Sequence, residues 1–284
     1  MSRPLLTLDG CKVRYGAVVA LNDASLQLQD GEAVGIVGAL GSGKTTLLRL
    51  VVGLAEAEHG TVCFEERDLH GTGTDARARH GIIHVPAGGG IFPSLSVREN
   101  LVLAQPRAGT QAEIDSMTQR FPVLGERLQQ RAGSLSGGEQ RQLAIARGVL
   151  ARPRLLLLDE PLLGLSPTTV QRVVGLLTAL RDAGIAMIVV EERPTDELQS
   201  LVHRLVGMRA GRVVAPQETA RIPEPRAGAG GSLDRVDVEM VGLPLSVRDR
   251  RALQTIAQQR GQPVGEVIAD LVHQHVEQRE EVWQ

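Results

Sequence analysis

Three short stretches of this chain contain residue types suited to chemistry on phosphate groups. The first is a glycine-rich loop, Gly38-Ala39-Leu40-Gly41-Ser42-Gly43-Lys44-Thr45-Thr46. Glycines in such a loop let backbone N–H groups curl around phosphate oxygens, and a helix that follows presents its positive N-terminus to them. Lys44 adds a cation that we expect to serve both binding and catalysis, and Thr45 offers a hydroxyl to Mg²⁺. The spacing therefore predicts a site for a nucleotide such as ATP together with Mg²⁺.

The second stretch is an acidic pair, Asp159-Glu160, which directly follows an apolar run. A carboxylate at the end of a buried strand can support a metal ion through its water shell, and we expect this role for Asp159. Glu160 is the candidate general base, or the residue that positions water, for attack on the γ-phosphate. The alternative interpretations are a strand cap for Asp159 and a surface glutamate before Pro161.

Buried strands must end beside the glycine loop if these side chains are to meet. Residues 33–37 form a short continuous apolar run that predicts a central strand, and residues 45–54 follow the loop as a predicted helix. Residues 154–158 and 185–190 are two further apolar runs, separated by a helix-like segment over 168–182. Strand, crossover helix and strand indicate a parallel sheet, whose carboxyl ends commonly bind ligands.

Two other regions add to this core. Residues 5–30 alternate apolar and polar residues in two runs, which predicts an antiparallel pair of strands. Residues 115–130 and 137–151 are predicted helices, so the middle of the chain should be a helical insertion. The predicted fold class is therefore α/β.

Length and composition exclude several classes of protein. The chain has 284 residues, of which 42% are hydrophobic, and a formal net charge of -2. No apolar run is long enough to span a membrane, and Met1-Ser2-Arg3-Pro4 lacks the layout of a signal peptide, so we expect a cytoplasmic location. The charge gives no global reason to bind nucleic acid or an anionic membrane. Cys11 and Cys63 are best interpreted as buried small hydrophobic residues.

The third stretch, Leu135-Ser136-Gly137-Gly138-Glu139-Gln140, resembles the signature sequence of ABC-type ATPases. By itself a Ser-Gly-Gly sequence is usually a flexible turn. The resemblance extends over approximately residues 5–215 and implies a P-loop ABC-type ATPase domain over 1–215. It implies that two such domains, in a homodimer or a heterodimer, pack head to tail around ATP. Ser136, Gly137, Gly138 and Gln140 would then close on the nucleotide held by the partner's glycine loop.

The same resemblance implies a role for Tyr15, which stands where the family has an aromatic residue that stacks on adenine. The alternative is an exposed tyrosine without a ligand. Residues 91–101 and 159–167 resemble one branch of the family, the ATPase subunits of importers for branched-chain amino acids and related amides. The chain would then hydrolyse ATP to energise uptake through a membrane permease, on the cytoplasmic face of the cell membrane. A soluble ATP-dependent regulator, whose C-terminal region binds DNA or a protein, is the alternative.

Two positions depart from the family pattern. Ala87 stands where the family has Gln, or in this branch often Glu, and Glu192 stands where most members have a switch His. A carboxylate about 4 Å from a phosphate charge costs about 4 kcal/mol at an effective dielectric constant near 20. We therefore expect an ionised Glu192 to point away from the phosphate. Our hypothesis is that this subunit binds ATP normally but hydrolyses it slowly on its own.

The C-terminal part of the chain changes in character. Residues 216–232 are rich in Pro and Gly and are predicted to be a linker. Residues 233–284 resemble a ribbon-helix-helix unit, with a strand over 236–241 and helices over 247–260 and 263–280. Six arginines and nine acidic residues give this module a net charge of -3, which makes DNA an unlikely partner. We expect it to dimerise or to dock a regulatory partner, and an appendage without such a role is the alternative.

Overall fold

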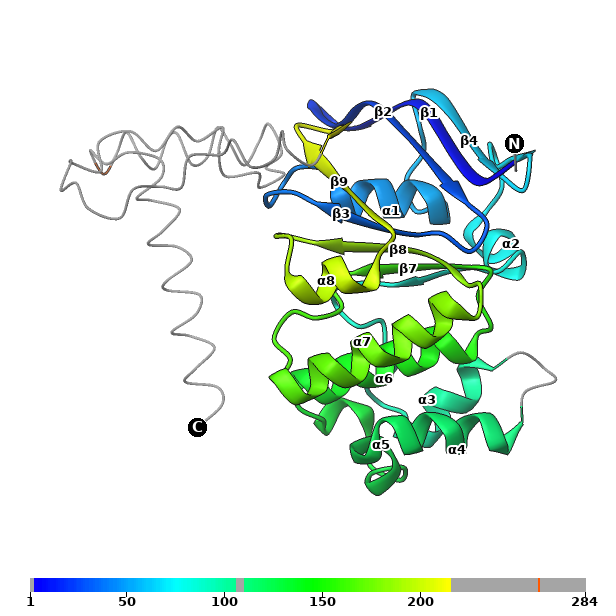
Figure 1. Cartoon of the computed structure of the whole chain (residues 1–284), viewed down its shortest axis with the longest axis vertical. Coiled ribbons are helices and arrows are strands. Elements are labelled where there is room, and N and C mark those ends of the chain that lie inside the picture. Colours follow the sequence, from blue (N-terminus) through cyan, green and yellow to red (C-terminus); the bar gives the residue numbers. More distant parts are fainter. Residues whose placement is uncertain (1–2, 106–109, 216–259, 261–284) are drawn as a thin grey trace. The chain divides into compact units, whose positions relative to one another are not determined.

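The computed structural model describes residues 3–105, 110–215 and 260 (Figure 1). The chain divides into two compact units, residues 1–222 and 223–284, and the first contains every predicted nucleotide-site residue. The linker predicted for residues 216–232 and the strand and helices predicted for residues 233–284 lie outside the described residues. Among the residues described, no helix is long and apolar enough to cross a membrane.

A six-stranded sheet forms the centre of the first unit. All neighbouring strands are parallel except the terminal pair, β10 and β9. In spatial order the strands are β10 (Arg212–Val214), β9 (Arg204–Arg209), β3 (Ala33–Val37), β8 (Ala186–Glu191), β7 (Leu155–Asp159) and β6 (Ile82–Val85). Val37 pairs with Glu191, and Asp159 pairs with Val190. The register therefore brings the carboxyl ends of β3, β7 and β8 together at one edge of the sheet.

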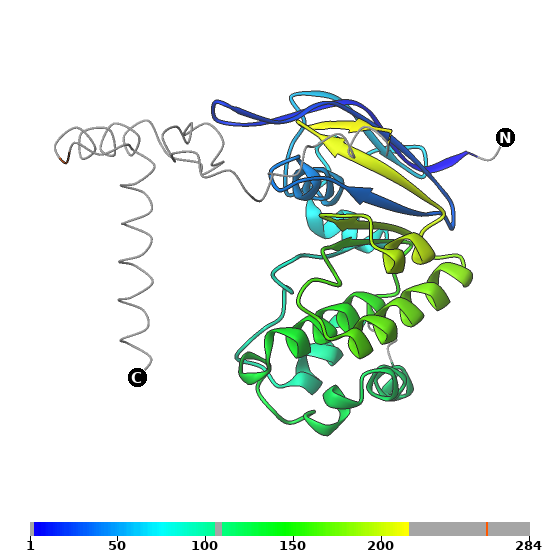
Figure 2. The ribbon, with the colours of Figure 1, turned by 60° about the vertical axis from the view of Figure 1, so that its left-hand side comes forward.

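Both faces of this sheet are buried, which explains the continuous apolar runs of its strands. On β7, Leu155 and Leu157 belong to one hydrophobic cluster, whereas Leu156 and Leu158 belong to a second. The first cluster contains α1 (Lys44–Val52), and the second contains residues of α6 (Gly137–Leu150) and α7 (Pro167–Asp182). Figures 1 and 2 show α1 on one side of the sheet and the helical region on the other.

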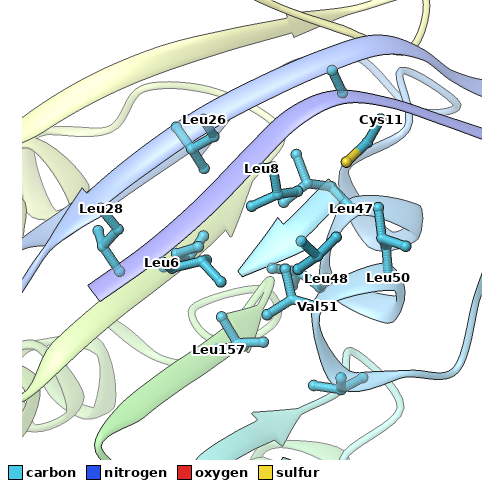
Figure 3. Packing of buried hydrophobic residues seen from close by; sticks show 14 of the residues in the cluster. Leu6, Leu8, Cys11, Leu26, Leu28, Leu47, Leu48, Leu50, Val51 and Leu157 are labelled. Carbon is cyan, nitrogen blue, oxygen red and sulfur yellow. The ribbon is translucent and has the colours of Figure 1, made fainter. Parts of the chain in front are cut away.

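An antiparallel sheet covers α1 from outside. Its strands, in spatial order, are β2 (Val18–Gln29), β1 (Pro4–Tyr15), β4 (His59–Phe64) and β5 (Arg67–Asp68). Leu6 and Leu8 of β1 point toward Leu47 and Leu48 of α1 (Figure 3). Cys11 lies in the same cluster, as predicted, and Cys63 is partly buried. The two sheets therefore hold α1, and the loop before it, in a fixed place.

The helical insertion is confirmed, but one of its predicted helices is wrong. The segment 115–130 contains the end of one helix and the whole of another, because α4 ends before the buried Phe121 and Pro122 begins α5. The remaining helices are α2 (Thr74–Arg79), α3 (Val97–Ala104), α4 (Gln111–Arg120), α5 (Pro122–Glu126), the 3₁₀ turn (Ala132–Ser134) and α8 (Asp196–Leu201).

Candidate nucleotide site

The glycine loop joins the end of β3 to the start of α1, as predicted. A Cβ atom at Gly38 would lie 2.3 Å from the carbonyl oxygen of Met208, and one at Gly43 would lie 2.6 Å from that of Ala20. Gly43 also has a φ of 107°, a conformation that other residues rarely adopt. Glycine is therefore required at both positions for the loop to fold against β2 and β9. The N-terminus of α1, with its unpaired N–H groups and positive dipole, opens into this loop.

Lys44 lies inside the loop. Its Nζ donates hydrogen bonds to the carbonyl oxygens of Gly38, at 2.6 Å, and Ala39, at 3.0 Å. Burial lowers the pKa of Lys44, and the nearby carboxylates of Glu160 and Asp159 oppose that shift. The hydroxyl of Ser42 is buried in the same loop and has no hydrogen-bond partner among the described residues. These groups give the loop a held cation and a polar atom suited to phosphate oxygens.

Asp159 has the surroundings of a residue that binds a cation. The residue is only 3% exposed, and neither carboxylate oxygen has a hydrogen-bond partner in the part of the chain that the structure describes. A buried unpaired charge is costly, so a ligand of opposite charge would relieve the site. Thr45, in the first turn of α1, is exposed and offers a hydroxyl. Within residues 3–105, 110–215 and 260, no group of three or more His, Cys, Asp or Glu side chains could hold a metal. Asp159 and Thr45 fit a hard cation such as Mg²⁺ that also binds phosphate oxygens and water.

Glu160 stands next to Asp159 in an unusual backbone conformation. Its φ is 50°, in the left-handed region that is unfavourable for a residue with a side chain. Its N–H donates to the carbonyl oxygen of Val190 at 2.9 Å. The side chain is partly exposed, so it remains accessible to a water molecule or a phosphate.

A third carboxylate, Glu191, was missed by the sequence analysis. It ends β8, is 9% exposed, and accepts a hydrogen bond from the N–H of Leu162 at 3.1 Å. Burial raises its pKa to about 7, the charge of Glu160 adds to the rise, and the Leu162 hydrogen bond opposes it. Its signal in the sequence was available, since it is an acidic residue that directly follows a buried apolar strand.

The signature residues lie at the start of α6. Ser136 caps this helix by accepting the N–H of Glu139, and Ser136 and Gly137 are exposed. Gly138 is partly exposed. Gln140 points back into its own turn, where its amide donates to the carbonyl oxygen of Leu135 at 3.1 Å. Ser136 and Gly137 are thus open to a second molecule, whereas Gln140 already has partners in this chain.

Three further predicted residues can be placed. Tyr15 ends β1, is paired with Val18 in the β1–β2 hairpin, and is 43% exposed. Ala87 follows β6, and its carbonyl oxygen accepts a hydrogen bond from Arg141 at 3.1 Å. Glu192 is exposed, and its charge acts on Lys44 after those of Glu160 and Asp159. Its carboxylate therefore lies within electrostatic reach of the glycine loop.

Comparison with known proteins identifies the class to which this fold and site belong. Residues 21–163 match the family model for ABC transporters. The chain therefore belongs to the ABC transporter ATP-binding family.

Several curated proteins of that family are similar to this chain. It is 38% identical over 213 residues to the high-affinity branched-chain amino acid transport ATP-binding protein BraG of Pseudomonas aeruginosa, covering 74% of this chain and 91% of that protein. It is 30% identical to LivG of Salmonella typhimurium, of the same description, over 79% of this chain and 96% of that protein. The lipopolysaccharide export system ATP-binding protein LptB of Escherichia coli is 33% identical over 74% of this chain and 89% of that protein.

A solved structure agrees with the fold. The dimeric structure of MJ0796, a bacterial ABC transporter cassette, superimposes with a TM-score of 0.67 at 24% identity, over 73% of this chain and 96% of that chain. The parallel core sheet, the antiparallel sheet and the helical insertion are thus confirmed as the ABC ATPase fold.

Proposed function

We propose that this chain is the ATP-hydrolysing subunit of an importer for branched-chain amino acids or related amides. The single observation that carries this proposal is the 38% identity to BraG across 91% of that protein. The resemblance of residues 91–101 and 159–167 to the same branch agrees with it. The solute itself would be selected by proteins other than this chain.

In this proposal each site residue has a defined task. Lys44 and the loop backbone bind the β- and γ-phosphates, and Tyr15 stacks on the adenine. Thr45 and Asp159 hold Mg²⁺, which neutralises part of the phosphate charge. Glu160 accepts a proton from, or orients, the attacking water. A second ATPase subunit supplies Ser136, Gly137 and Gly138 to complete the site.

The proposed partner in the membrane is a permease, because the similar proteins are transport ATP-binding proteins. The chain would then act as a peripheral subunit on the cytoplasmic face of the cell membrane. ATP-driven closure and reopening of the paired ATPase subunits would move the permease between its two states.

The test is reconstitution of the full chain with permease subunits and a solute-binding protein in lipid vesicles. We expect ATP-dependent uptake of leucine, isoleucine or valine, and no uptake when the complex carries Glu160→Gln. ATP hydrolysis stimulated by lipopolysaccharide or a polyamine, but not by these amino acids, would contradict the proposed solute. Absence of a permease complex, together with salt-sensitive DNA binding by the full chain, would favour the regulator instead.

A further inference from the structure

The loop after β6 has almost no side chains with which to hold itself in place. Ala87 is followed by Gly88, Gly89 and Gly90, and the last two have φ values of 81° and 59°. A run of glycines has wide conformational freedom, so ordering it costs more entropy than ordering other residues. The loop closes one turn of its own, because the Gly89 N–H donates to the carbonyl oxygen of Pro86 at 2.8 Å, and further support comes from groups elsewhere in the chain.

Helix α6 supplies those groups. The guanidinium of Arg141 donates to the carbonyl oxygen of Ala87 at 3.1 Å, and that of Arg147 donates to the carbonyl oxygen of Gly90. The Arg147 guanidinium also lies 4.8 Å from the centroid of the Phe92 ring, a cation–π distance. Two arginines of one helix thus hold the two ends of the glycine run.

Arg141 also reaches the candidate site itself. Its other terminal nitrogen donates to the carbonyl oxygen of Glu160. The peptide on the other side of Glu160 is held as well, because the Glu160 N–H donates to Val190. Glu160 has a φ of 50°, and a left-handed non-glycine residue persists only where its surroundings hold it there. Arg141 shares this task on the carbonyl side with the backbone N–H of Leu163, which donates to the same Glu160 oxygen at 3.3 Å.

We propose that Arg141 is a positioning residue for ATP hydrolysis, which ties the Ala87 carbonyl to the Glu160 carbonyl. The loop after β6 and the general base then move as one, although position 87 has only a methyl group. Arginine suits this task because its planar fork presents two N–H groups in fixed directions, whereas a lysine ammonium is a single point. The inference rests on the ATPase activity and does not depend on which solute is carried.

The kinetic test compares Arg141→Gln and Arg141→Lys with the unchanged chain, in the assembled complex. We expect kcat to fall about tenfold to a hundredfold in both variants, because a small misplacement of a catalytic group has effects of this size. The KM for ATP should stay within about threefold, since among the described residues the hydrogen bonds of Arg141 go to Ala87 and Glu160 and not to the glycine loop or Lys44. Arg79→Gln, which removes an exposed pair with Asp75 on α2, is the matched control and should leave both constants unchanged.

A second measurement needs no turnover. Hydrogen exchange of the same variants should become faster in peptides covering residues 86–92 and in peptides covering residues 160–165 together, with thermal unfolding within a few degrees of the unchanged chain. Full recovery of kcat by Arg141→Lys would overturn the inference, because charge alone would then suffice. Unchanged exchange in either segment, or a loss of kcat matched by general unfolding, would overturn it too. Failure of amino acid uptake in a complex that hydrolyses ATP would contradict the proposed function and leave Arg141 in its role.

Discussion

Four carboxylates act electrostatically on Lys44, and they come from the ends of two neighbouring strands. Glu160 and Asp159 follow the apolar run of β7, and Glu192 and Glu191 stand at the end of β8. Asp159 and Glu160 have tasks in the proposed phosphate chemistry. Glu191 and Glu192 have none there. We expect the charge of Glu191 to affect the stability of the fold and that of Glu192 to affect the rate of hydrolysis.

Glu191 should make the stability of the chain depend on pH. Its pKa is raised to about 7, so the folded state binds a proton that the unfolded chain releases near its ordinary pKa of 4.5. The stability that depends on this Glu191 proton is fully present below about pH 4.5 and is lost as the pH rises through about 7. Glu191→Gln keeps an acceptor for the Leu162 N–H but removes the charge. We expect the unfolding free energy of the variant to exceed that of the unchanged chain by about 2 kcal/mol more at pH 8 than at pH 5.

Urea unfolding without nucleotide or Mg²⁺, at pH 5 and pH 8, measures this difference. Glu56→Gln, in the exposed loop after α1, is the control and should show no such pH-dependent gain. A gain of the same size at both pH values would mean that Glu191 is ionised throughout this range.

Glu192 should slow hydrolysis, because its exposed carboxylate adds negative charge near Lys44 and the phosphates that Lys44 would bind. Glu192→Gln removes the charge and keeps the length of the side chain. With Mg²⁺-ATP in excess, we expect kcat to rise. The rise would be about tenfold if the loss of this repulsion lowers the activation free energy by about 1.4 kcal/mol. Steady-state ATPase assays at low and high salt provide the measurement. Equal turnover in both proteins would contradict the hypothesis of a slow site.

At the scale of the element, the start of β3 depends on a side chain far away in the sequence. Ala33 is fully buried, and its backbone N–H donates to the ring Nδ1 of His203 at 2.9 Å. The backbone N–H of His203 donates in turn to the Ala33 carbonyl oxygen at 2.8 Å. His203→Ala would leave a buried N–H without a partner and should lower the unfolding free energy by about 1–3 kcal/mol. His203→Asn places an oxygen near the position of Nδ1 and should recover most of the loss in urea unfolding. Equal losses in both variants would show that ring packing, not this hydrogen bond, matters.

The elements that the sequence predicts best are those with strong local signals. The strand before the glycine loop and the strand that ends at Asp159 were predicted because their apolar runs are buried on both faces. β6 has only four residues, and His84 interrupts its apolar pattern. β9 begins and ends with arginine and contains Gly207. Such strands are recognised only when the sheet that they join is known.

The candidate site shows the same division. The glycine loop and the Asp159-Glu160 pair are each a compact sequence motif, so local spacing was enough to find each of them. Arg141 was not predicted, because its partners Ala87 and Glu160 are remote in the chain and offer backbone carbonyls, which carry no residue signal. Only the packing of α6 against the carboxyl edge of the sheet brings the three together.

At the scale of the whole molecule, the exposed signature turn predicts that ATP is enclosed between two subunits. Glu160→Gln should bind ATP without hydrolysing it, and we expect this variant to retain ATP with Mg²⁺ through gel filtration as a dimer.

Gly137 offers a matched disruption, because a Cβ there meets nothing within 4 Å of its own chain. Aspartate in the first turn of α6 suits the helix N-terminus, so Gly137→Asp should leave the subunit folded. Its carboxylate would nevertheless face the partner's phosphates, where like charges repel. The double variant Glu160→Gln, Gly137→Asp should therefore elute without ATP, as measured by light scattering for mass and by quantifying the co-eluting nucleotide. Retention of ATP by the double variant, at the same level as by Glu160→Gln alone, would show that the signature turn of one subunit does not close on the nucleotide of the other.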